Sequence, residues 1–132
     1  MSTPKYSLVM LVDDNELDNF INKKLIEADG FGGATTIHPS AQDALAYLKM
    51  HADAPGQVPD LIFLDIMMPE MDGFGFLDEF DKLPDPVKSK CKIIMLSTSD
   101  SFKDLNRANQ NKYVKRFLNK PLNAQILAAL NV

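Results

Sequence analysis

The sequence has little that would suggest a secreted, membrane-inserted or nucleic-acid-binding protein. It contains one cysteine, Cys91, which cannot form an internal disulfide and has no companion for a metal site, so a reducing compartment is expected. No run approaches the roughly 18 apolar residues of a membrane helix, and the polar start MSTPKYS is unlike a secretion signal. The 14 Lys and Arg residues are scattered and outnumbered by 18 Asp and Glu residues, which argues against binding to nucleic acid. We therefore expect a soluble, cytoplasmic protein without membrane insertion or direct nucleic-acid contact.

The length and apolar content fit one domain of ordinary size. With 132 residues, 45% of them hydrophobic, the chain can bury a real core but has little room for a second module. No repeat, low-complexity tract or linker interrupts it. We assign residues 1–132 to a single domain and expect no output domain after it.

Short apolar runs alternate with segments of helical periodicity, which indicates βα units that build a parallel sheet. The hydrophobicity of the clearest runs is continuous rather than alternating, as in strands covered by helices on both faces. The five runs are residues 7–12, 34–37, 61–64, 92–96 and 116–119. The pattern predicts an α/β fold with five strands.

The intervening segments carry helical stripes. The first runs from Leu17 to Ala28, and its apolar residues fall on one stripe; they are Leu17, Phe20, Ile21, Leu25 and Ala28. Glycines 30, 32 and 33 are expected to end this helix, and Pro39-Ser40 to begin the next. The fourth helix, roughly residues 101–109, is the weakest, because only Phe102 and Leu105 are clearly apolar.

Polar residues follow several of the predicted strands. In open parallel sheets, ligands bind outside the carboxyl ends of the strands. The residues there are Asp13, Asp14 and Asn15 after the first run, Asp65 after the third, Ser97, Thr98 and Ser99 after the fourth, and Lys120 and Pro121 after the fifth. These side chains are therefore expected to meet at one edge of the sheet.

Three of these residues, Asp13, Asp14 and Asp65, would place like charges together and need a cation. Lys120 supplies one positive charge, and all-oxygen ligation suits Mg²⁺. A carboxylate such as Asp65 can then attack a phosphoryl group as a nucleophile. Mg²⁺, Lys120 and the Ser97 hydroxyl with backbone N–H groups would each hold one phosphoryl oxygen.

Four segments, in this order and at these separations, resemble the response-regulator receiver family of two-component signalling, and the resemblance spans essentially the whole chain. They are LVDD (11–14), PDLIFLDIMMPEMDG (59–73), IIMLST (93–98) and FLNKP (117–121). The resemblance implies a flavodoxin-like, doubly wound (βα)5 fold with strand order 2-1-3-4-5. It implies Asp65 as phosphoacceptor. It implies Asp14 as a direct Mg²⁺ ligand, Asp13 as a ligand that acts largely through water, and the Met67 carbonyl as a further ligand. It also implies Ser97 as the switch hydroxyl, Lys120 as the phosphoryl contact, Phe117 as the aromatic switch residue and a cis bond at Pro121.

The resemblance further implies a signalling switch rather than an enzyme. The phosphoryl donor would be a sensor histidine kinase or a histidine phosphotransfer protein. The signal would leave through altered protein contacts of the fourth helix, fifth strand and fifth helix, as in a stand-alone regulator. Two positions depart from the commonest family pattern: Ser97 stands where threonine is more frequent, and Thr98 where alanine or glycine is common. We expect the bulk of Thr98 to restrict access of water and small donors to Asp65.

Other interpretations of these residues stay open at this point. Asp13 and Asp14 also suit the start of a helix, and Phe117 also suits static core packing. A degenerate receiver that serves only as a scaffold is the main rival function. An aspartyl phosphatase would usually carry a second acid where Met67 stands, and a flavodoxin-like cofactor binder would need a phosphate loop where VDDNE would repel phosphate.

Overall fold

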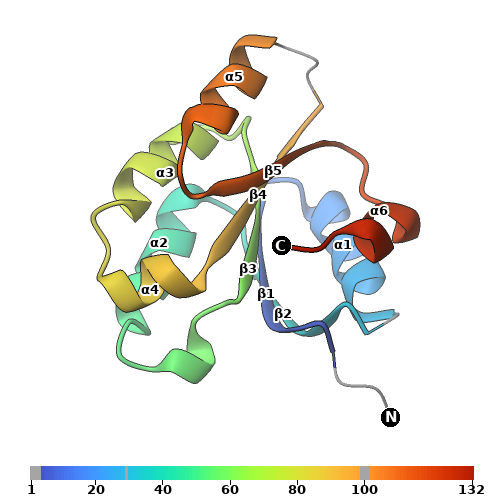
Figure 1. Cartoon of the computed structure of the whole chain (residues 1–132), viewed down its shortest axis with the longest axis horizontal. Helices are drawn as coiled ribbons and strands as arrows, with labels where there is room; N and C mark the ends of the chain where they lie inside the picture. Colours follow the sequence, from blue (N-terminus) through green and yellow to red (C-terminus); the bar gives the residue numbers. More distant parts are fainter. Residues whose placement is uncertain (1–3, 29, 99–101) are drawn as a thin grey trace.

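Five parallel strands form one sheet in the order β2-β1-β3-β4-β5 (Figure 1). The computed structural model describes residues 4–28, 30–98 and 102–132. The strands are β1 (Tyr6–Val12), β2 (Gly32–His38), β3 (Leu61–Asp65), β4 (Lys92–Ser97) and β5 (Val114–Asn119). All four neighbouring pairs run parallel. The predicted fold class and strand order are therefore confirmed.

Helices cover both faces of the sheet. Figure 1 shows α1 and α6 on one face and α2, α3 and α4 on the other, with α5 above that second group. The bounds are α1 (Glu16–Ala28), α2 (Ala41–Met50), α3 (Gly73–Phe80), α4 (Asp85–Lys90), α5 (Phe102–Gln110) and α6 (Ala124–Ala129), with a 3₁₀ turn over Pro55–Gln57. None of the helices traced in the described ranges is long and apolar enough to cross a membrane.

The short helix α4 was not predicted from the sequence. Its six residues DPVKSK bury only Val87, so they show no helical stripe. The backbone N–H groups of Val87 and Lys88 both bond to the carbonyl of Pro84, which starts the turn. Local hydrogen bonding after a proline, rather than hydrophobic periodicity, thus forms this element.

Only part of the predicted apolar stripe of α1 packs against the core, where Leu25 is partly buried. Leu17, Phe20 and Ile21 are 65%, 60% and 46% exposed, and the buried residues of α1 are Asn19, Asn22 and Ile26. The Asn19 amide donates to the backbone carbonyl of Asp13 at 2.8 Å, which fixes the rotation of the helix. The buried face of α1 therefore includes two asparagines, while three apolar side chains of the stripe lie in solvent.

The other helix signals are mostly confirmed. The Ser40 hydroxyl accepts from the backbone N–H of Asp43 and caps α2, and Asn15 caps α1 in the same way through Asp18. Gly30, at φ 74°, lies just past α1. Glycines 32 and 33, however, open β2, where a Cβ on Gly32 would lie 2.6 Å from Ile26.

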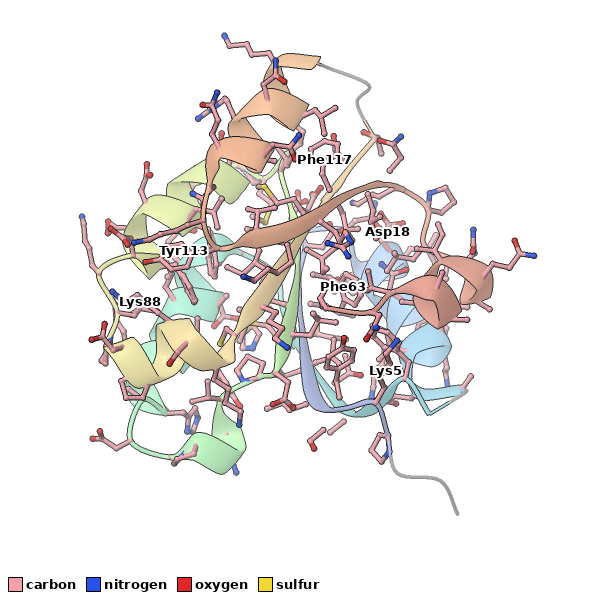
Figure 2. The ribbon with its side chains drawn as sticks, viewed as in Figure 1. Lys5, Asp18, Phe63, Lys88, Tyr113 and Phe117 are labelled. Atoms are coloured by element: carbon pink, nitrogen blue, oxygen red, sulfur yellow. The ribbon has the colours of Figure 1, made fainter. Side chains whose placement is uncertain are left out.

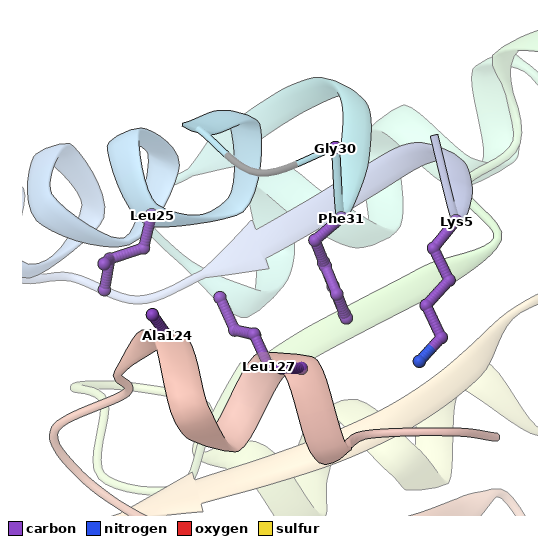
Figure 3. Close-up of a pocket in the computed structure, with 7 residues that line it drawn as sticks. Lys5, Leu25, Gly30, Phe31, Ala124 and Leu127 are labelled. Atoms are coloured by element: carbon purple, nitrogen blue, oxygen red, sulfur yellow. The ribbon is translucent and has the colours of Figure 1, made fainter. Parts of the chain in front are cut away.

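A small apolar cavity of about 150 Å³ lies between α1, the start of β2 and α6 (Figure 3). Its lining residues are Lys5, Leu25, Gly30, Phe31, Ala124, Leu127 and Ala128. It lies toward the amino ends of β1 and β2, and none of the predicted site residues lines it. The chemistry must therefore be sought at the opposite edge of the sheet.

Candidate functional site

The carboxyl edge of the sheet carries the predicted site. Asp13 follows β1, Asp65 ends β3, Ser97 ends β4 and Lys120 follows β5. Asp65 lies beside Leu96 in the β3–β4 register, and Ser97 lies beside Asn119 in the β4–β5 register. The backbone N–H of Lys120 donates to the Ser97 carbonyl at 2.9 Å. Residues far apart in the sequence are thus held together by the sheet itself.

Asp13 is buried and fixed from several sides. It is 4% exposed, and its Oδ1 accepts from the backbone N–H of Asn15 at 2.9 Å. Its backbone N–H donates to the carbonyl of His38 at 3.1 Å. Its carbonyl accepts from the Asn19 amide, as described above. This carboxylate has little freedom to move.

Asp65 lies at 5% exposure under a tight β3–α3 turn. The backbone N–H of Gly73 donates to the Ile66 carbonyl at 2.9 Å, and a Cβ on Gly73 would lie 2.8 Å from the Asp65 carbonyl. Glu70 takes a positive φ of 69° within this turn, and the Asp72 carboxylate accepts from the Gly75 N–H to cap α3. The glycine permits the close return of the chain that fixes Asp65.

Lys120 joins the carboxylates. Its Nζ lies 2.7 Å from Asp13 Oδ2, 3.3 Å from Asp65 Oδ1 and 3.4 Å from Asp18 Oδ2. The peptide bond between Lys120 and Pro121 is cis, as the resemblance implied. One ammonium group therefore lies among three carboxylates.

The electrostatics of the cluster follow from burial and charge. Burial raises the pKa of Asp65 from 3.8 to about 6, Asp13 adds to this effect, and Lys120 opposes it. Burial also lowers the pKa of Lys120, but its contacts with Asp13 and Asp65 outweigh burial, so the pKa lies above its ordinary value. Lys120 is thus charged near neutral pH, and Asp65 is mostly ionised but easily protonated.

The acidic cluster has the donor set of a hard divalent cation. Carboxylate oxygens of Asp13, Asp14 and Asp65 all lie within 4.8 Å of one another, with Asp14 exposed to solvent. An all-oxygen set that leaves an open side for water suits Mg²⁺. These three residues could hold the ion that the sequence led us to expect.

The remaining predicted residues surround the cluster. The Met67 side chain is 67% exposed in the β3–α3 loop, and Thr98 is exposed just after β4. Phe117 lies half-buried on β5 next to Met95 and packs against the core on the α2 and α3 side (Figure 2). Ser99, which the strand-end pattern also included, lies outside the described residues.

Asp18 was missed by the sequence analysis. It lies in the first turn of α1, toward the carboxyl edge of the sheet (Figure 2). Together with Lys120 it lines a cavity of about 270 Å³, whose other lining residues are Ile21, Asn22, Thr98, Pro121 and Leu122. Its position three residues after the capping Asn15 was the signal that could have placed it at this edge.

Comparison with known proteins agrees with this geometry. The profile of the response regulator receiver domain matches residues 9–131. The chemotaxis protein CheY of Bacillus subtilis is 31% identical over 93% of both chains. A two-component response regulator from Cytophaga hutchinsonii superimposes with a TM-score of 0.85 at 29% identity, covering 93% of this chain and 92% of that one. The CheX–CheY–BeF3–Mg complex from Borrelia burgdorferi gives a TM-score of 0.72 at 26% identity, covering 92% and 84%.

The curated relatives differ widely in size. This chain covers 93% of the Bacillus subtilis protein, 50% of a rice response regulator and 6% of a Dictyostelium discoideum hybrid histidine kinase. Several relatives are thus much longer proteins in which only a part matches. What is common to all of them is the matched domain, and the chain belongs to the family of response regulator receiver domains.

Proposed function

We propose that this receiver domain is a phosphorylatable switch that accepts a phosphoryl group on Asp65. One observation carries the proposal: the Lys120 ammonium lies between the buried carboxylates of Asp13 and Asp65, beside an exposed Asp14. Two buried acids and one partly buried cation at the end of a rigid sheet are poorly explained by stability alone, since such pairs seldom stabilise a fold. They fit phosphoryl transfer, which needs positioned charge of both signs.

Each residue has a role in this proposal. An Asp65 oxygen attacks phosphorus, and the bond between phosphorus and the donor atom breaks with its electron pair leaving on the donor. Lys120 contacts one phosphoryl oxygen, and the Ser97 hydroxyl contacts another. Mg²⁺, when bound by Asp13, Asp14, Asp65 and the Met67 carbonyl, neutralises phosphoryl charge.

The donor is a sensor histidine kinase or a histidine phosphotransfer protein. A protein donor must contact the rim of the site, and the exposed α1 face formed by Leu17, Phe20 and Ile21 lies there. Ile21 itself lines the cavity that contains Lys120 and Thr98. Contiguous exposed apolar residues beside a reactive group are typical of a docking surface.

The signal leaves through the face built from α5, β5 and α6, where Phe117 is half-buried against the core. Receiver domains of this kind are signalling switches rather than classic enzymes. Phosphorylation and dephosphorylation of Asp65 are the only chemistry that we assign to this chain. The proposed location is the cytoplasm, where such donors act.

A mass measurement tests the proposal. Incubation with acetyl phosphate and Mg²⁺ should add ~80 Da to the intact protein, and Asp65→Asn should abolish the gain. The exposed Asp53 offers a matched control, because Asp53→Asn removes an exposed carboxylate that is not part of the acidic cluster and should leave the gain intact. Absence of the gain in the wild type would favour the scaffold function, and its persistence in Asp65→Asn would assign the acceptor elsewhere.

A further inference from the structure

Asp18 has a place in the site that neither the metal nor Lys120 explains. Its side chain is 39% exposed, and its Oδ2 lies 3.4 Å from Lys120 Nζ. It is not part of the group formed by Asp13, Asp14 and Asp65, whose oxygens lie close enough for one ion. Lys120 already contacts two buried carboxylates. A third acid at this point is therefore superfluous for neutralising the lysine.

The charge of Asp18 would also oppose a bare phosphoryl group. Lys120 contacts Asp65 on one side and Asp18 on the other, so the two carboxylates are separated by a single ammonium group. Asp65 Oδ1 and Asp18 Oδ2 lie 3.3 Å and 3.4 Å from the same Nζ, so a phosphoryl group that contacts Lys120 also lies near the Asp18 charge, where like charges repel. A carboxylate at this position favours only a donor that brings positive charge of its own.

We propose that Asp18 is a specificity-determining residue that favours phosphoramidate donors, whose leaving group carries an N–H and positive charge, over acyl phosphates. This inference rests on the proposed role of Asp65. The class includes protonated phosphohistidine and the small molecule phosphoramidate. The Asp18 carboxylate accepts a hydrogen bond from the donor N–H and attracts its charge.

The transfer step balances without a co-reactant. The P–N bond breaks and its electron pair goes to nitrogen, while an Asp65 oxygen forms the new P–O bond. A phosphoimidazolium leaves as neutral imidazole, and phosphoramidate leaves as ammonia. Asp18 holds the proton on the donor by its charge and takes up none itself. Acetyl phosphate releases an acetate anion, which Asp18 repels.

The cavity beside Asp18 suits such a leaving group. Ile21, Pro121 and Leu122 give it apolar walls, against which a flat imidazole ring can pack. Asn22, 7% exposed, adds an amide to the lining, and Thr98 adds a hydroxyl. The volume of about 270 Å³ accommodates a small ring, and the polar groups match its N–H.

Phosphorylation by two small donors tests the inference without a partner protein. We expect Asp18→Asn to lower the ratio of the second-order rate constant for phosphorylation by phosphoramidate to that by acetyl phosphate by about twofold to fivefold, the range for one partly exposed ion pair. Asp18→Glu should retain the wild-type ratio. Glu16→Gln is the matched control, because it removes an exposed charge from the same turn of α1, and it should leave the ratio unchanged.

An unchanged ratio in Asp18→Asn would overturn the inference, even if the rates with both donors fall equally, since it would reduce Asp18 to a support for Lys120. Asp18→Ser provides a second test if Asp18→Asn proves unstable, and it should lower the ratio of the rates with the two donors by the same factor. Failure of both donors to add mass to the wild type would instead contradict the role of Asp65. An intact mass gain with an unmoved ratio would contradict the role of Asp18 alone.

Discussion

Asp65 links the stability of the metal-free protein to pH. Its pKa is raised to about 6 in the folded protein from an ordinary value of 3.8, first by burial and then by Asp13. Between these values the folded state holds a proton that the unfolded chain has released, so the free energy of unfolding falls as pH rises through this window. Asp65→Asn removes the effect. Near neutral pH the variant should be more stable by on the order of 2 kcal/mol, and near pH 4 the difference should vanish.

Urea denaturation in the presence of a chelator, at several pH values, measures this difference. Asp14→Asn is the control, because Asp14 is exposed and its loss should leave most of the slope in place. Parallel pH profiles for wild type and Asp65→Asn would show that Asp65 does not carry the linkage.

Gly73 permits the tight turn behind Asp65. An alanine Cβ would lie 2.8 Å from the Asp65 carbonyl, 2.9 Å from Met95 Cε and 3.0 Å from Ile66 Cα. Two of these are backbone atoms that cannot move aside, so Gly73→Ala should lower the free energy of unfolding by about 1–3 kcal/mol. Gly56→Ala is the control, because nothing lies within 4 Å of its Cβ. Equal stability of the two variants by chemical denaturation would contradict this account.

Thr98 controls access to the site in our proposal, since it is exposed and lines the same cavity as Lys120. Thr98→Ala removes a hydroxyl and a methyl group, which should admit water to the phosphorylated Asp65 more readily. We expect faster loss of the phosphoryl group in an autodephosphorylation assay. Equal or slower loss from the alanine variant would rule out this role, and a stability measurement would check that the fold is unchanged.

At the scale of elements, the proposed docking surface for a protein donor is the exposed apolar face of α1. Phe20, 60% exposed, has much area left to bury on docking. Phe20→Ser should therefore slow phosphoryl transfer from a cognate histidine donor by about tenfold, the typical loss for an aromatic interface residue. Phosphorylation by acetyl phosphate should stay at the wild-type rate. Met50→Ser, at a residue 78% exposed on α2, is the matched control.

Comparison of the rates with the two donors shows whether the substitution affects docking or the phosphorylation site itself. A loss of rate with acetyl phosphate as well would indicate damage to the site rather than to docking. An unchanged rate with the protein donor would place the docking surface elsewhere.

The sequence predicted elements well where local chemistry decides them, and less well where tertiary contacts do. The strands were predictable because continuous apolar runs suit a covered parallel sheet, and Ser40 was predictable as a cap. The facing of α1 was not, because the helix buries Asn19, whose amide donates to the Asp13 carbonyl, and leaves much of its apolar stripe exposed. Asp18 was missed because its pairing with Lys120 spans most of the chain. Long-range contacts leave no local pattern.

At the scale of the whole molecule, the strand ends hold one group of site residues in a rigid arrangement, and the flanking helices supply the residues around them. Asp13, Asp65, Ser97 and Lys120 all stand at or just beyond strand ends, so a single rigid body sets their spacing. The flanking helices supply Asp18 and the α1 surface, which can differ between relatives without disturbing that spacing. In the proposed function, the sheet thus carries the chemistry and the elements around it determine the choice of donor.

Mg²⁺ should reverse the pH dependence of stability of the whole domain. An ion that binds only the folded protein stabilises it by about 2.7 kcal/mol at a hundredfold excess over Kd. Binding requires ionised carboxylates, so the Mg²⁺-induced rise in Tm should grow as pH increases through the Asp65 pKa of about 6. Asp14→Asn should abolish most of the rise and Asp53→Asn should not. A rise that is independent of pH, or one that survives loss of Asp14, would show that the ion binds outside the cluster of Asp13, Asp14 and Asp65.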